Sequence, residues 1–104
     1  MQISARNDGN ATTLMLAGRF DFNAHRDFRK GYEDALNAGG INELVLDMRG
    51  VDYLDSSALG MLMLLNERAK AVNKPVTLLN TSGVVSQVLG VANFSKIFNI
   101  KHAS

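Results

Sequence analysis

The chain has 104 residues, of which 46% are apolar and 20% charged, values typical of one soluble globular domain with a single core. Eleven Lys and Arg residues oppose ten Asp and Glu, which argues against nucleic acid as the main partner because binding to a phosphate backbone needs a basic surface. The absence of cysteine excludes disulfides and thiol chemistry. We therefore expect one domain spanning residues 1–104.

Two features of the sequence favour a cytoplasmic protein that does not enter a membrane. Residues 1–6 lack the apolar segment of a signal peptide. The longest apolar run, residues 58–65, is far too short to cross a bilayer.

The first half of the chain predicts a hairpin followed by a helix. We expect, in chain order, an edge strand, a turn, a returning strand and a loop over residues 1–6, 7–10, 12–17 and 18–22. Asn23 is then predicted to cap a helix that runs to about Ala38 and is ended by Gly39 and Gly40.

The second half predicts alternating strands and helices. Residues 43–48 suit a buried central strand because Leu44, Val45 and Leu46 are consecutive apolar residues. Next we expect a helix, a buried strand, a helix capped by Ser82 and a short last strand over residues 57–72, 76–79, 82–91 and 96–100. This order predicts an α/β fold: a mixed sheet of four to five strands with an N-terminal hairpin, packed against three to four helices.

Motifs of enzymes and metal sites are missing from the sequence. It contains no glycine-rich phosphate loop, no Gly-x-Ser-x-Gly elbow and no cysteine nucleophile. His25 and His102 do not have metal-ligand spacing, and we expect both on the surface. The sequence therefore predicts no catalytic residues, no metal site and no bound cofactor.

An acid and two serines, Asp55, Ser56 and Ser57, lie where a strand-loop segment enters a helix. One interpretation is an ordinary N-cap, in which Asp55 or Ser56 satisfies free backbone N–H groups. The other is a phosphorylation site, because a phosphate at a helix N-terminus faces unpaired N–H groups and the positive end of the helix dipole. Such a phosphate adds roughly −1.5 to −2 charges at neutral pH.

The helix that follows is apolar on every side between residues 58 and 65, a pattern that indicates burial on all faces or a partner on the outer one. Gly60 in its interior costs about 0.5–1 kcal/mol relative to alanine, which suggests close approach by another backbone. Met61 and Met63 are adaptable contact residues. The alternative is a core helix whose methionines fill gaps, and in either case Leu62 and Leu65 should be buried.

These segments resemble a known family. Residues 55–60 (DSSALG), after residues 44–47 and 51–54, are similar to the signature of STAS domains, and most similar to that of bacterial anti-sigma factor antagonists. Residues 18–21 followed by 23–24 resemble the second motif of that family. The resemblance covers nearly the whole chain, with two departures: Ala58 replaces a usual glycine, and Phe22 adds a bulky aromatic ring to the loop.

The resemblance implies a partner-switching mechanism. An unphosphorylated antagonist binds an anti-sigma factor that is also an ATP-using serine kinase, and a separate phosphatase of the PP2C type reverses the phosphorylation. The implied acceptor is Ser56, with Asp21, Asp55 and Ser57 as its neighbours, while ATP is used by the kinase and not held by this chain. A STAS subunit of a transporter or stress-sensing complex, without switching, is the alternative.

The partner is expected to cover the Ser56 end of the helix together with the Asp21 loop, and the free protein is expected to be a monomer. The expected partner contacts are Phe22, Asn23, Ala58, Gly60, Met61 and Met63.

Overall fold

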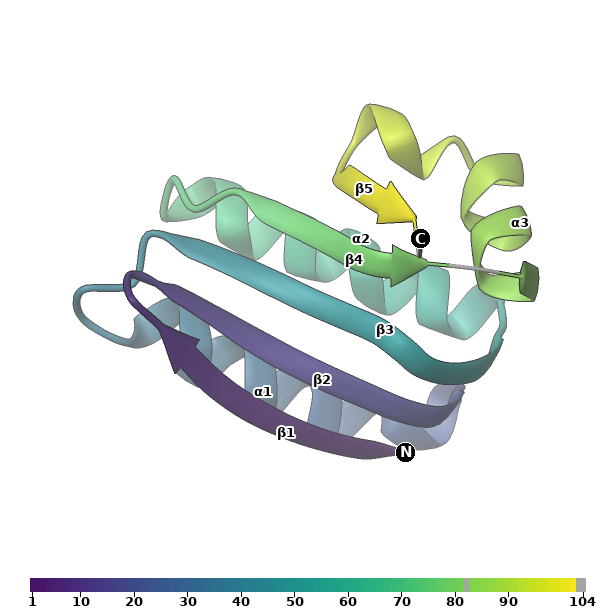
Figure 1. The fold of residues 1–104 in the computed structure, drawn as a ribbon, viewed down its shortest axis with the longest axis horizontal. Helices are drawn as coiled ribbons and strands as arrows, with labels where there is room; N and C mark the ends of the chain where they lie inside the picture. Colours follow the sequence, from purple (N-terminus) through teal and green to yellow (C-terminus); the bar gives the residue numbers. More distant parts are fainter. Residues whose placement is uncertain (82, 103–104) are drawn as a thin grey trace.

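The computed structural model describes residues 1–81 and 83–102, and these form one five-stranded sheet with helices packed against it (Figure 1). The strands are β1 (Gln2–Asp8), β2 (Ala11–Phe20), β3 (Glu43–Leu54), β4 (Val76–Thr81) and β5 (Asn99–His102). The helices are α1 (His25–Asn37), α2 (Ser56–Ala71) and α3 (Gly83–Val91), with short 3-10 turns η1 (Phe22–Ala24) and η2 (Phe94–Lys96). The predicted α/β class, mixed sheet, N-terminal hairpin and three helices are confirmed.

The sheet has the order β1-β2-β3-β4-β5. β1 is antiparallel to β2, and the turn between them contains Gly9 with a φ of 63°, which glycine adopts without strain. The other pairs are parallel, so that Leu14, Leu46, Leu78 and Ile100 form one row across four strands. Parallel pairing places the carboxyl ends of β2, β3 and β4 along one edge of the sheet.

β3 is longer than the predicted strand 43–48 because its pairing with β2 continues to Leu54. The register shifts twice along the way, between Met15 and Ala17 and between Gly18 and Arg19. Gly50 lies at the first shift, where an added Cβ would be only 2.8 Å from the Cβ of Ala17. Each shift adds one residue to β3 and rotates the strand, as β-bulges do.

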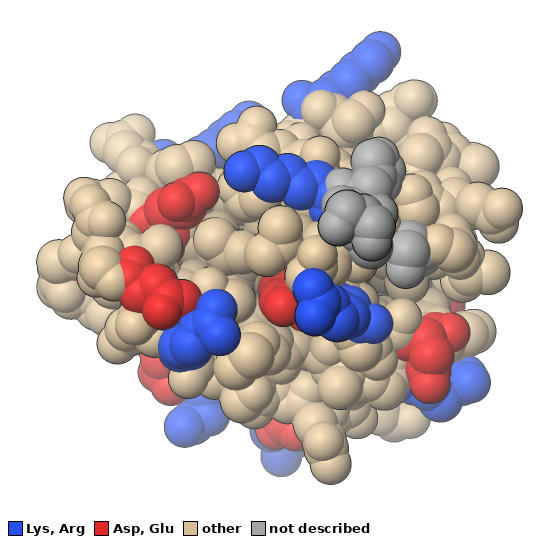
Figure 2. Space-filling view, in the orientation of Figure 1, with Lys and Arg blue, Asp and Glu red and all other residues tan. Residues whose placement is uncertain are grey.

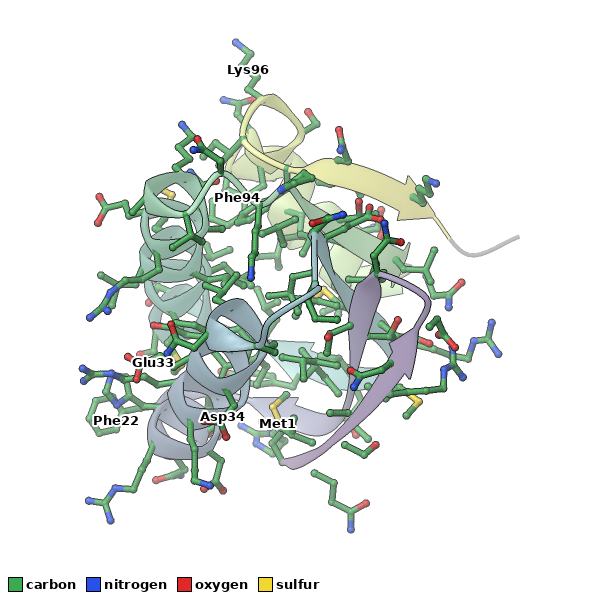
Figure 3. All side chains as sticks on the ribbon, turned by 90° about the vertical axis from the view of Figure 1, so that its left-hand side faces the viewer. Met1, Phe22, Glu33, Asp34, Phe94 and Lys96 are labelled. Carbon is green, nitrogen blue, oxygen red and sulfur yellow. The ribbon has the colours of Figure 1, made fainter. Side chains whose placement is uncertain are left out.

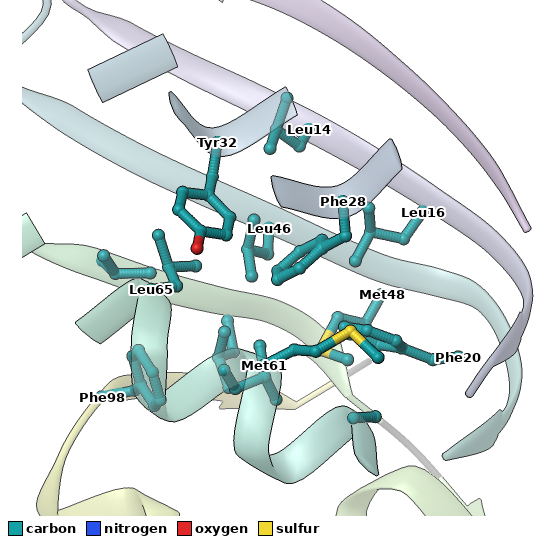
Figure 4. Close-up of a cluster of buried hydrophobic side chains, with 14 of the residues drawn as sticks. Leu14, Leu16, Phe20, Phe28, Tyr32, Leu46, Met48, Met61, Leu65 and Phe98 are labelled. Atoms are coloured by element: carbon teal, nitrogen blue, oxygen red, sulfur yellow. The ribbon is translucent and has the colours of Figure 1, made fainter. Parts of the chain in front are cut away.

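Helices α1 and α2 cover one face of the sheet and enclose the core (Figures 1 and 4). The Phe28 ring lies between Phe20 and Tyr32, with ring centroids 4.8 Å and 5.3 Å away. Leu62 and Leu65 are completely buried, as predicted. On the opposite face, Figure 2 shows acidic and basic side chains dispersed among uncharged ones.

Several predicted boundaries differ from the structure. The loop predicted over 18–22 is shorter, because β2 continues to Phe20, and Asn23 does not cap α1 because it lies inside η1. The last strand begins at Asn99 and not at residue 96, since Phe94–Lys96 forms η2. The predicted cap residue Ser82 and the side chain of His102 lie outside the described residues.

Candidate functional site

The candidate site lies at the edge of the sheet where β2 and β3 end. Phe20 and Leu54 are the last paired residues of these two strands, and both side chains are buried. Asp21 and Asp55 follow them directly, so the two acids leave neighbouring strands at the same level. The sequence motifs at 18–24 and 55–60, far apart along the chain, therefore meet at one edge.

Asp55 is the N-cap of α2. It has an extended backbone, with φ −118° and ψ −174°, and its Oδ1 accepts a hydrogen bond of 3.0 Å from the backbone N–H of Ala58. Of the two capping residues that the sequence left open, the structure thus selects Asp55. Ser56 is the first residue of the helix and is exposed, while Ser57 is half-buried. The helix start is consequently capped without any contribution from the Ser56 hydroxyl.

Asp21 organises the end of β2. Its Oδ1 accepts a hydrogen bond of 3.0 Å from the backbone N–H of Asn23 and so caps η1. The Nε of Arg19 lies 3.5 Å from its other carboxylate oxygen, and the Arg19 guanidinium carbon lies 3.9 Å from the centroid of the Tyr53 ring. The Asp21 loop is therefore tied to β3 through a cation and an aromatic ring.

Phe22 projects from this loop into solvent. Its side chain is 71% exposed and stacks on His25, with ring centroids 6.1 Å apart. Figure 3 shows Phe22 at the outer edge of the helical layer, pointing away from the sheet. An exposed aromatic ring of this size is a suitable anchor for a partner protein.

The expected partner contacts on α2 fall into two groups. Gly60 and Met63 are exposed, whereas Ala58 and Met61 are 0% and 5% exposed and belong to the core. Figure 4 shows Met61 pointing into the buried cluster. The expectation that Ala58 and Met61 contact a partner is therefore wrong for this conformation, because both lie on the helix face that packs against the sheet.

Sequence analysis overlooked two features of this edge. Arg19 and Tyr53 each precede one of the site acids by two residues, and strand periodicity places such residues on the same face as the acids. The second feature is an apolar groove of about 380 Å³ between α2 and α3, lined by Leu59, Gln87, Val88, Val91 and Ala92. The sequence gives one indication of this groove, because α3 contains no charged residue.

Ionisable groups elsewhere in the structure have structural roles. The pKa of Glu33 is lowered by a hydrogen bond from Arg29, and burial raises the pKa of Tyr32. Within residues 1–81 and 83–102 no cluster of His, Asp and Glu side chains is suited to a metal ion. In the same part of the chain, no helix has the length and apolar character needed to span a membrane.

Comparison with known proteins places the chain in a family. The family model described as "Mlab, STAS domain" matches residues 3–100, and the chain belongs to the STAS-domain family. A STAS-domain containing protein of Pseudomonas aeruginosa (strain UCBPP-PA14) is 45% identical over 93 residues, which cover 89% of this chain and 90% of that protein.

Solved structures of low sequence identity share the fold. The anti-sigma factor antagonist SpoIIAA in its unphosphorylated form superimposes with a TM-score of 0.75 at 19% identity, over 99% of this chain and 90% of that one. A sulfate transporter family protein from Wolinella succinogenes gives a TM-score of 0.76 at 15% identity, over 89% of this chain and 78% of that one. The fold therefore occurs both in an anti-sigma factor antagonist and in a transporter-family protein.

Proposed function

We propose that this chain, as one STAS domain, is an anti-sigma factor antagonist controlled by reversible phosphorylation of Ser56. The observation that supports this most directly is that the residue capping α2 and the exposed hydroxyl residue at its start are two different residues. Asp55 caps the helix, while Ser56 is exposed and takes no part in the cap. A kinase can therefore modify Ser56 without removing the helix cap.

Phosphorylation changes the charge of the partner surface without requiring a change of fold. Asp21 and Asp55 already place two carboxylates at this edge, and a phosphate adds roughly −1.5 to −2 charges. Like charges brought together in an interface cost several kcal/mol. A change from mostly bound to mostly free needs about 5.5 kcal/mol of differential affinity, so one phosphate is of the right order to release the partner.

The proposed partner surface combines the Asp21 loop with the outer face of α2. It comprises the exposed residues Phe22, Asn23, Gly60 and Met63 around Ser56. We expect the partner to be an anti-sigma factor that is also a serine kinase, with a PP2C-type phosphatase acting in reverse. The switch operates in the cytoplasm, ATP is bound by the kinase, and the free antagonist is a monomer without cofactor, nucleic acid or membrane contact. The antagonist itself catalyses no reaction.

Phosphorylation by the kinase partner tests the proposal. The wild type and the variants Ser56→Ala and Ser57→Ala are incubated with ATP and the kinase that the wild type retains from the native bacterium, and the products are mapped by mass spectrometry. We expect phosphate on Ser56 in the wild type and in Ser57→Ala, and none in Ser56→Ala, which should bind the kinase permanently. Phosphate on Ser57 that persists in Ser56→Ala would show that the acceptor is misassigned.

The second candidate function is a STAS subunit of a transporter or stress-sensing complex that does not switch. Two observations favour it: the matching family model is named for Mlab, and the fold is shared with a sulfate transporter family protein. In that case the retained partner is a transporter ATPase, and Ser56→Ala binds it with unchanged affinity whether or not ATP is present. Identifying the partner that the wild type retains, and measuring how Ser56→Ala binds it with and without ATP, therefore distinguishes the two functions.

A further inference from the structure

Arg19 places a cation beside the end of β3, where Asp55 and Ser56 follow. It pairs in register with Tyr53, and its guanidinium lies 3.9 Å from the centre of that ring. Tyr53 precedes Ser56 by three residues, at most about 10 Å of extended chain. Neighbouring strands lie about 4.8 Å apart. An arginine and a phosphoserine side chain directed toward each other can bridge this separation.

The contact that holds Arg19 at present is weak and replaceable. Its Nε lies 3.5 Å from Oδ2 of Asp21, and the Arg19 side chain is 63% exposed. The other oxygen of Asp21, Oδ1, makes the hydrogen bond that caps η1. Arg19 can therefore leave Asp21 without opening the turn.

Stacking on Tyr53 prepares the guanidinium for an anion. A guanidinium that lies over an aromatic ring keeps its N–H groups at its edge, where they remain available for a planar, two-pronged contact with a phosphate. The ring also restricts the side chain, so that less conformational entropy is lost when the contact forms.

We infer that Arg19 binds the phosphate on Ser56 and exchanges Asp21 for it while it stays stacked on Tyr53. This inference rests on the proposed phosphorylation of Ser56 and adds a positioning residue to it. Arg19 compensates part of the repulsion that the phosphate meets from Asp21 and Asp55. Its departure leaves the Asp21 carboxylate without its cation, so phosphorylation at α2 also changes the charge of the loop that presents Phe22.

The test uses protein in which phosphoserine is inserted at position 56 during translation, so that no kinase is needed. Titration of the phosphate by phosphorus NMR gives its second pKa, which a nearby guanidinium lowers because it favours the dianion. We expect Arg19→Gln to raise this pKa by roughly 0.5 unit or more and Arg19→Lys to restore part of the shift. Tyr53→Leu, which removes the ring but keeps the cation, should raise it by a smaller amount.

The matched control is Arg49→Gln, which removes an exposed cation from β3, seven residues before Ser56. It should leave the second pKa of the phosphate unchanged. The inference is overturned if Arg19→Gln, shown to be folded by circular dichroism, titrates like the wild type, or if Arg49→Gln shifts the pKa as much. If Arg19→Gln does not fold, an unshifted Tyr53→Leu titration overturns it equally. Because the phosphate is installed without a kinase, failure of the proposed function would appear separately, as absence of Ser56 phosphorylation by the partner.

Discussion

Gly60 allows the fold and the partner surface to be tested with one methyl group. It is the fifth residue of α2 and is exposed, and a Cβ built on it meets no atom within 4 Å beyond its chain neighbours and the backbone of its own helix. Glycine inside a helix costs about 0.5–1 kcal/mol relative to alanine, and nothing in the chain offsets that cost here. Gly60→Ala should therefore increase the free energy of unfolding by this amount, which corresponds to roughly 2–8 °C in Tm for a domain of this size.

The same Gly60→Ala substitution should weaken partner binding, although it stabilises the fold, if the partner's backbone lies against Gly60 in the proposed surface. Forcing a methyl group into a packed contact costs about 1–3 kcal/mol, or roughly fivefold to 150-fold in Kd. Urea denaturation measures the first effect, and calorimetric titration with the anti-sigma partner measures the second.

Gly90→Ala is the control, because Gly90 is also an exposed helical glycine with open space around its Cβ position, but lies on α3 outside the proposed surface. It should leave the partner's Kd unchanged. A Gly60→Ala variant that is stabilised and binds like the wild type would show that no partner backbone approaches this position. A destabilised variant would contradict the structural reasoning itself.

Three further predictions concern the buried and exposed methionines of α2, the two candidate caps of α2, and Gly50 in β3. Met61→Ala should lower the free energy of unfolding by about 2–5 kcal/mol, measured by urea denaturation, because Met61 is in the core. Met63→Ala should change this free energy little but weaken partner binding, measured by calorimetric titration. Asp55→Ala should lower the free energy of unfolding by about 0.5–2 kcal/mol through loss of the cap, while Ser56→Ala should stay within about 0.5 kcal/mol of the wild type in the same urea assay. The opposite order would mean that Ser56 is the cap. Gly50→Ala should destabilise by about 1–3 kcal/mol because its Cβ would lie 2.8 Å from that of Ala17, and a Tm equal to that of the wild type would show that the bulge can relax.

The order of strands and helices could be predicted because each element has a clear local signal. The Asn7–Asn10 turn, the glycines after α1 and the apolar run at residues 44–46 all mark elements that the structure contains. The two shifts in β3 could not be predicted, because they arise from pairing with β2 and leave only the glycines Gly50 and Gly18 as traces in the sequence.

The faces of α2 were ambiguous for a different reason. Residues 58–65 are apolar all round, so periodicity within that segment does not distinguish Met61 from Met63. Only the second half of the helix, where Glu67 is exposed and Ala69 buried, fixes which side faces water. Similarly, Asp55 and Ser56 are both good caps, and only backbone geometry at the end of β3 decides between them.

The division of roles between Asp55 and Ser56 has a consequence for the lifetime of the protein. Because the cap of α2 does not use the Ser56 hydroxyl, phosphorylation leaves the cap in place, and the modified molecule should present no more targets to cellular proteases than the unmodified one. The total amount of the protein would then be set by its synthesis and dilution, and the proportion of each form by the two opposing enzymes alone. Signal strength and protein abundance could thus be adjusted independently.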